Sequence, residues 1–151
     1  MLTDIAVERT TPLDAPIMAA LHQSCFPRPW DEAAMTTFIA SPDTICLLAS
    51  INDDSRRTSA GFLIARKAAD EAELLTLVVA PQWRRAGLGR ALLKSAMATL
   101  GENGAKQLFL EVEDSNEAAL GLYRSLGATA VGSRARYYEQ GANAVIFSLA
   151  L

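Results

Sequence analysis

Residues 78–93 of the chain read Val78-Val79-Ala80-Pro81-Gln82-Trp83-Arg84-Arg85-Ala86-Gly87-Leu88-Gly89-Arg90-Ala91-Leu92-Leu93. An apolar strand, a basic loop with two glycines and the start of an apolar helix follow one another. Glycines let backbone N–H groups approach an anion, a helix N-terminus adds partial positive charge, and arginines add full charge. The stretch therefore predicts an anion-binding cradle between a strand and a helix, with a turn lined by solvated arginines as the alternative.

Two common phosphate-binding motifs fit this stretch poorly. A P-loop requires GxxxxGK followed by Ser or Thr, and no such string occurs in the chain. The dinucleotide motif GxGxxG begins at Gly87, and Glu111 lies roughly where a ribose-binding acid belongs, but Leu92 stands where Gly or Ala is needed for close packing. The segment also follows a hairpin in mid-chain, so it does not open a βαβ unit.

The rest of the chain alternates between extended and helical patterns. We expect strands near 5–7 and over 44–51, 60–66, 73–79, 108–113, 129–138 and 144–151, and helices over 12–25, 30–40, 91–100 and 118–126. In the first helix, Ile17 and Leu21 repeat at helical spacing and are expected to face inward, with Met18 and Cys25 as further candidates for the same face. Asp114, with Glu117 three residues later, is expected to cap the last helix. The prediction is an α+β fold in one domain, 1–151, with a central mixed, mostly antiparallel β-sheet flanked by helices.

Composition narrows the class of protein. The chain has 151 residues, of which 50% are hydrophobic and 21% charged, as in a soluble globular domain. Its net charge of −3 disfavours direct nucleic-acid binding, and no apolar run is long enough to span a membrane. Because no export signal is evident, we expect a cytoplasmic protein. Cys25, Cys46 and the single histidine, His22, supply neither a zinc site nor a catalytic triad, so no metal is expected.

A family resemblance rests on the loop and on segments to either side of it. Arg84-Arg85-Ala86-Gly87-Leu88-Gly89 matches the (Q/R)xxGx(G/A) acetyl-CoA loop of the GNAT acetyltransferases. Downstream, Leu110-Glu111-Val112, Asn116-Glu117-Ala118-Ala119 and Leu122-Tyr123-Arg124-Ser125-Leu126-Gly127 are similar to that family's second half. Upstream, Phe26-Pro27-Arg28-Pro29-Trp30-Asp31-Glu32 resembles the PW(S/D)E-like segment of the RimI branch, which acetylates the N-terminal alanine of a small-subunit ribosomal protein.

The resemblance implies a GNAT fold and a role for particular residues. Acetyl-CoA would be held by Leu77, Val78, Val79, Arg84, Arg85, Ala86, Gly87, Leu88, Gly89, Arg90 and Asn116. Glu111 resembles the branch's general base and Tyr123 its general acid, while Trp30, Tyr137 and Tyr138 would lie on the substrate side. Two departures concern the substrate-side loop: Ala128 follows Gly127 where Phe is common, and Glu139 follows the tyrosine pair where proline is usual.

The chemistry of acetyl transfer supports two of these assignments independently. An N-terminal amine has a pKa near 7.7 to 8.0, so a modest base such as Glu111, directly or through a water, can accept its proton. The departing thiolate needs a proton, which the O–H of Tyr123 can donate. The structural alternatives are a solvent-facing Glu111, a packing role for Tyr123, a helix anchor at Trp30 and local hydrogen bonds at Asn116. His22 is expected to be a surface or packing residue and not a catalyst.

These observations predict an acetyl-CoA-dependent N-acetyltransferase. Transfer is expected to be direct, since no cysteine is expected near the site to carry an acetyl group. The preferred acceptor is a protein N-terminus, most specifically alanine of a small-subunit ribosomal protein, and the chain is expected to be a monomer or a weak homodimer. A GNAT enzyme for a small amine or a lysine, and a non-catalytic acetyl-CoA-binding module, are the alternatives.

Overall fold

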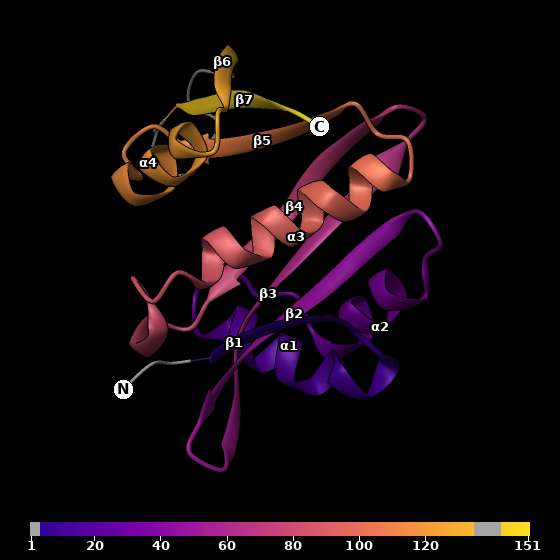
Figure 1. The fold of residues 1–151 in the computed structure, drawn as a ribbon, viewed down its shortest axis with the longest axis vertical. Helices are drawn as coiled ribbons and strands as arrows, with labels where there is room; N and C mark the ends of the chain where they lie inside the picture. The colour runs from indigo at the N-terminus through magenta and orange to yellow at the C-terminus, as the bar shows by residue number, and fades with distance from the viewer. Residues whose placement is uncertain (1–3, 135–142) are drawn as a thin grey trace. The chain divides into compact units, whose positions relative to one another are not determined.

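The computed structural model describes residues 4–134 and 143–151 (Figure 1). Strands and helices follow one another in the order expected from the sequence. They are β1 (Asp4–Arg9), the 3-10 turn η1 (Pro12–Asp14), α1 (Ala15–Gln23), α2 (Glu32–Ala40), β2 (Thr44–Asp53), β3 (Arg56–Ala68), β4 (Glu71–Val79), the 3-10 turn η2 (Pro81–Trp83), α3 (Leu88–Glu102), β5 (Gln107–Glu113), α4 (Glu117–Ser125), β6 (Thr129–Arg134) and β7 (Ala144–Ala150).

The strands form a mixed sheet in the order β1-β2-β3-β4-β5-β7-β6. The pairs β1/β2, β2/β3, β5/β7 and β6/β7 are antiparallel. β4 and β5 are parallel, with Glu71–Glu73 opposite Gln107–Phe109. Parallel neighbours need a crossover connection, and α3 supplies it. The predicted α+β class with a mixed, mostly antiparallel sheet is confirmed.

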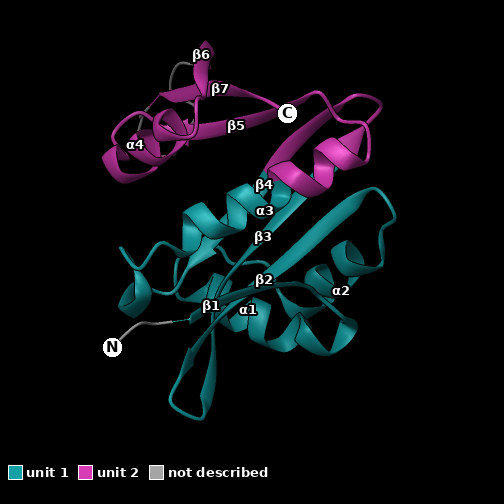
Figure 2. Ribbon diagram, in the orientation of Figure 1, with its two compact units in different colours: residues 1–66, 75–96 teal, residues 67–74, 97–151 magenta. Residues whose placement is uncertain are grey.

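The chain divides into two compact units, shown in different colours in Figure 2. The first lies within Met1–Arg66 and Leu75–Ala96, and the second within Lys67–Leu74 and Met97–Leu151. The boundaries fall inside β4 and α3, so both elements contribute residues to each unit. The expectation of one domain stays a prediction.

In the first unit, α1 and α2 cover one face of the strands. Side chains two residues apart in a strand point to the same face. The shared core on this face consists of Ala15, Met18, Leu21, Met35, Cys46, Leu48, Phe62, Ile64, Val78 and Ala80. On the opposite face of β2 and β3, Ile45, Leu47, Leu63 and Ala65 are buried as well. Both faces of these strands are therefore buried.

The inner face of α1 differs in part from the face expected from the sequence. Of the α1 residues expected to face inward, Met18 and Leu21 are buried, whereas Ile17 is 38% exposed, so the expectation for Ile17 is wrong. The inner face of α1 instead runs through Ala15, Met18 and Leu21.

The glycine at position 61 is required by the packing of β3 against β4. A Cβ at Gly61 would lie 2.5 Å from the carbonyl oxygen of Val78, so the close approach of the two strands excludes any side chain there.

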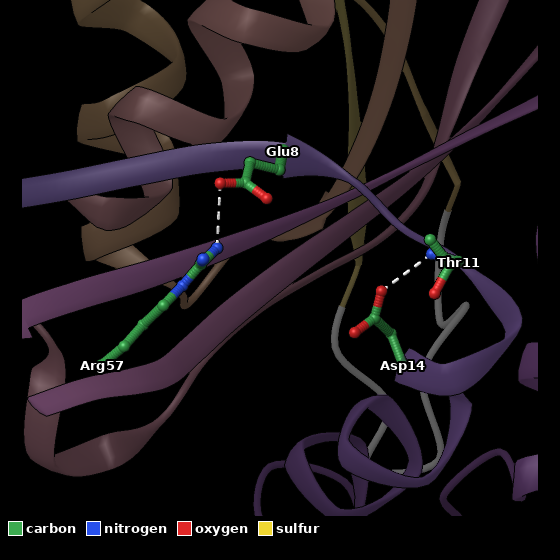
Figure 3. Close-up of polar contacts among 4 residues, drawn as sticks. All are labelled: Glu8, Thr11, Asp14 and Arg57. Atoms are coloured by element: carbon green, nitrogen blue, oxygen red, sulfur yellow. Dashed lines mark hydrogen bonds and ion pairs between the residues drawn. The ribbon is translucent and has the colours of Figure 1, made fainter.

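Two polar contacts lie near the start of the chain (Figure 3). Glu8 Oε1 and Arg57 Nη2 form an ion pair at 3.0 Å between β1 and β3, and both side chains are more than half exposed, so the pair adds little stability. The backbone N–H of Thr11 donates to Asp14 Oδ2 at 2.8 Å. That bond satisfies an amide at the point where the strand ends and the first helix begins.

In the second unit, β5 has the alternation expected of a half-buried strand. Leu108, Leu110 and Val112 are buried, while Gln107 and Glu111 are exposed. β7 pairs with β5 along its length, with Ile146 opposite Glu111. α4 buries Leu120 and Tyr123.

Membrane-spanning helices and metal clusters are both absent from residues 4–134 and 143–151. No helix in these ranges has both the length and the hydrophobicity that a bilayer crossing requires. Within the same ranges, His, Cys, Asp and Glu side chains form no group of three or more that could hold a metal ion.

Candidate functional site

The basic loop between β4 and α3 has an unusual backbone. Arg85 has a φ of 67° and Gly87 a φ of 88°, with Ala86 between them. Glycine adopts this left-handed region at little cost, whereas other residues are strained in it. Successive backbone N–H groups in such turns form concave anion-binding sites. The loop therefore has the geometry expected of the predicted cradle.

The start of α3 adds to that geometry. The N–H of Ala91 donates to the carbonyl oxygen of Gly87 at 3.0 Å, so Gly87 directly precedes the first helical turn. The first N–H groups of a helix, here beginning with Leu88 and Gly89, have no acceptor within the helix and can bind an anion. The Leu88 side chain is 1% exposed and fixes the helix start in the core. The exposed cations of this segment are Arg84, Arg85 and Arg90.

A cysteine lies at the end of β4. Cys25 Sγ donates to the carbonyl oxygen of Val79 at 3.5 Å, and Arg84 Nη2 donates to the same sulfur at 3.7 Å. The expectation that no cysteine lies near the predicted site is therefore wrong. Cys25 and Val79 are 54 positions apart in sequence, so no local pattern could have joined them. Of the β4 residues predicted to bind the cofactor, Val78 is buried, whereas Leu77 and Val79 are half-buried.

His22, in the last turn of α1, and Trp30, which follows the helix, belong to one aromatic group. The His22 ring stacks on Phe26 at 4.3 Å and on Trp30 at 4.8 Å between centroids. Trp30 in turn packs against Phe38 of α2, at 5.1 Å. His22 is 3% exposed, so of the two alternatives expected from the sequence, surface or packing, it is buried and packs against these rings. Trp30 is half-buried and anchors the segment before α2.

Glu111 lies exposed on β5, in the second unit. Its neighbours Leu110 and Val112 point to the opposite, buried face. This position is compatible with a base that acts directly or through a water.

Tyr123 is 6% exposed in α4. Its ring meets Phe147 of β7 edge-on, with centroids 6.1 Å apart. The helix then ends in a left-handed cap, in which Gly127, with φ of 95°, donates to Arg124 O and Ala128 donates to Tyr123 O, both at 3.0 Å. The sequence departure at Ala128 therefore leaves the helix end that holds Tyr123 intact.

Asn116 caps α4. Its Oδ1 accepts the N–H of Ala119 at 3.1 Å, so Asn116, and not Asp114, is the N-cap. The predicted capping box from Asp114 to Glu117 is wrong. The residues just before the helix turn tightly, since Asn116 N–H donates to Glu113 O at 2.9 Å, and this places Asn116 at the helix start. Its cap bond uses the carbonyl of the amide and leaves the NH₂ group as a donor.

The predicted site residues are distributed over both units. The first unit holds Trp30, Leu77, Val78, Val79 and the loop 84–90, while the second holds Glu111, Asn116 and Tyr123. Tyr137 and Tyr138 lie outside the described residues. The sequence reasoning missed the contact of Cys25 with β4 and the hydrogen bond that the backbone N–H of Trp30 donates to His22.

Comparisons with known proteins define the class. The model of the Acetyltransferase (GNAT) family matches residues 15–128. The [ribosomal protein bS18]-alanine N-acetyltransferase of Escherichia coli (strain K12) is 35% identical over 125 residues, covering 83% of this chain and 81% of the relative. The chain therefore belongs to the GNAT family of acetyltransferases. Its reaction is N-acetyl transfer, and it is similar to the RimI-type enzymes, as the sequence predicted.

Solved structures support the same assignment. The crystal structure of the ribosomal-protein-S18-alanine N-acetyltransferase from Escherichia coli superimposes with a TM-score of 0.85 at 30% identity, covering 97% of this chain and 94% of that chain. Arabidopsis thaliana NAA60 in complex with acetyl-CoA gives a TM-score of 0.86 at 18% identity, covering 98% of this chain and 100% of that chain. The second similarity shows the fold alone.

Proposed function

We propose that this chain transfers an acetyl group from acetyl-CoA to the N-terminal α-amine of a protein, with alanine of the small-subunit ribosomal protein bS18 as the preferred acceptor. The observation that carries the proposal is the similarity, over most of both chains, to an enzyme named for this acceptor. Because ribosomal proteins are made and assembled in the cytoplasm, the proposal also places the enzyme there.

Acetyl-CoA supplies the acetyl group as a thioester, and this chain supplies a binding surface for its anionic part. The left-handed turn at Arg85 and Gly87, the start of α3 and the exposed arginines together favour a pyrophosphate. The backbone of Leu77, Val78 and Val79 would lie along the pantetheine arm. Asn116 would contribute its NH₂ group, since its Oδ1 is used in the helix cap.

The catalytic roles follow from the needs of the reaction. The attacking amine must lose a proton, and Glu111 is an exposed carboxylate that can accept it. The leaving thiolate must gain a proton, and Tyr123 carries an O–H on a ring that packs edge-on against Phe147. The two residues would thus act at opposite ends of the transfer, Glu111 as base and Tyr123 as acid.

Direct transfer from the thioester to the amine remains part of the proposal despite the position of Cys25. The thiol already donates to Val79 O, and its sulfur accepts from Arg84. Replacing Cys25 with Ala should therefore leave turnover largely intact. The wild-type protein should carry no acetyl group after incubation with acetyl-CoA alone. Loss of turnover together with an acetylated wild-type cysteine would establish a covalent route instead.

On the acceptor side, Trp30, Tyr137 and Tyr138 are proposed to contact the first residues of the peptide. A lid formed by the two tyrosines would admit a small first side chain, such as Ala, more readily than a large one.

Thiol release from acetyl-CoA tests the proposal against its alternatives. The acceptors are an Ala-initiated bS18 peptide, the same peptide with a blocked α-amine and an internal lysine, and a set of small amines. Fastest release with the free Ala terminus supports the proposal. Fastest release with the lysine peptide or a small amine would assign the enzyme to a different acceptor class.

A further inference from the structure

The only histidine of the chain is buried in the last turn of α1. His22 is 3% exposed, and rings of Phe26 and Trp30 stack on it with interplanar angles of 21° and 13°. A third ring, Phe62 of β3, lies 6.2 Å away between centroids. The imidazole is therefore enclosed by aromatic groups that carry no charge.

His22 also binds the chain that follows it at three points. Its Nδ1 accepts the backbone N–H of Trp30 at 3.0 Å. Its carbonyl oxygen accepts the N–H groups of Cys25 and Phe26, each at 3.1 Å. One residue thus fixes both ends of the segment 25–30 that joins α1 to α2, which we call the linker.

The neutral form of the ring is required for this arrangement. An imidazole that accepts at Nδ1 carries its proton on Nε2, whereas a protonated ring donates from both nitrogens and cannot accept. The linker is further tied to the end of β4, because Cys25 Sγ donates to Val79 O. The orientation of the linker therefore depends on an uncharged acceptor at His22 Nδ1.

We propose that His22 is a positioning residue for the acceptor peptide. By accepting the N–H of Trp30 and filling the space between Trp30 and Phe26, it holds the linker in one conformation, with the Phe26 ring 41% exposed at the surface. The inference rests on the proposed function, in which Trp30 lies on the acceptor side. His22 does not touch the reacting atoms in this account, and it acts through Trp30.

Two substitutions separate the role of the hydrogen-bond acceptor at His22 Nδ1 from that of the aromatic ring. His22→Phe keeps an aromatic ring between Phe26 and Trp30 but removes the acceptor. His22→Asn loses the ring but places a carbonyl oxygen close to the position of Nδ1. Met18→Leu, a change of similar volume at a 0% exposed position on the same helix, is the matched control.

We expect the substitutions at His22 to change only the KM for the peptide. A buried donor left without a partner is costly, so His22→Phe should raise the peptide KM about tenfold. Acetyl-CoA affinity, and kcat at saturating peptide, should stay near the wild-type values. His22→Asn should recover most of the peptide KM, and Met18→Leu should leave it unchanged. An unchanged peptide KM in folded His22→Phe, or equal KM values for the Phe and Asn variants, would overturn the proposal.

The rate of hydrogen exchange at the Trp30 amide tests the role of His22 without any measurement of acetyl transfer. We expect the Trp30 amide to be protected in the wild type and in His22→Asn, and to exchange faster in His22→Phe. The amides of α1 should exchange at wild-type rates in all three proteins. If His22→Phe does not fold, His22→Gln, whose acceptor lies one bond too far, replaces it with the same expectation. A wild type that acetylates no peptide would refute the proposed function, whereas equal Trp30 exchange in all variants would refute the role of His22.

Discussion

The backbone N–H of Trp30 donates to His22 Nδ1 at 3.0 Å, within a group of aromatic rings that excludes water from the imidazole. Burial lowers the pKa of His22 from its usual value, because the charged form is desolvated. The rings that face it, from Phe26, Trp30 and Phe62, carry no negative charge and so supply no counter-ion for the imidazolium. The folded protein therefore favours neutral His22.

This relationship predicts a specific pH dependence of stability. Between the lowered pKa of folded His22 and about 6.5, the value in the unfolded chain, the unfolded state binds more protons. Stability should be fully present above about pH 6.5 and should fall as the pH drops below it. The melting temperature of His22→Phe, which lacks the titrating group, should fall less between pH 7 and pH 5.5 than that of the wild type. Parallel declines in the two proteins would contradict the assignment.

Gly87 should be necessary for binding acetyl-CoA. Its φ of 88° disfavours any side chain, and a β-branched residue most of all, although the nearest atom to a Cβ at this position, Ile5 Cδ1, would lie 4.0 Å away. Gly87→Val should therefore distort the backbone rather than clash, and weaken acetyl-CoA binding by about tenfold or more by calorimetry. Gly121→Ala, in α4 with no neighbour within 4 Å of its Cβ, serves as the control and should bind normally. Normal affinity in folded Gly87→Val would show that the loop does not hold the ligand.

Tyr123→Phe should retain the fold and lose rate. The variant keeps the edge-on contact with Phe147 and removes only the hydroxyl. Loss of a proton-transfer group commonly lowers kcat by about 10²- to 10⁴-fold. Phe147→Leu keeps the hydroxyl but weakens the packing. It should lower the melting temperature, while its loss of kcat should be smaller than that of Tyr123→Phe. Near-normal turnover in Tyr123→Phe would leave the tyrosine with a packing role alone.

Glu111→Gln should show a rate defect that depends on pH. At neutral pH the variant should be slow, because nothing removes the proton from the amine. Above about pH 8 the α-amine deprotonates unaided, and the rate should recover in part. Glu113→Gln, two residues along the same strand, is the control and should follow the wild-type pH profile. A defect in Glu111→Gln that is equal at every pH would rule out the role of a base.

The site was predictable where its determinants are local in sequence. The order of strand, basic loop and helix around Gly87 can be read from residue types alone, and the structure has the left-handed backbone that such a loop requires. Asp31 before α2 is a similar case, since its Oδ1 accepts the N–H of Ala34 at 2.9 Å and caps the helix that the sequence predicts to open there.

The errors have identifiable physical causes. Asp114 and Asn116 are both favourable N-cap residues, and the choice between them depends on where the chain turns after β5. The inner face of α1 is set by the position of the helix against β2 and β3, which favours Met18 over Ile17. The contact of Cys25 with Val79 and the bond from Trp30 to His22 depend on how separate segments pack, and hydrophobic periodicity carries no information on either.

The position of the acetyl group on a product peptide shows whether the enzyme modifies a protein N-terminus or a lysine side chain. The enzyme is incubated with acetyl-CoA and a bS18 N-terminal peptide that carries both a free Ala terminus and an internal lysine, and the product is fragmented by mass spectrometry. We predict acetylation of the alanine α-amine, with an unmodified lysine and a slower reaction when Leu or Trp replaces the alanine. An acetyl group on the lysine, or equal rates for Ala-, Leu- and Trp-initiated peptides, would contradict it.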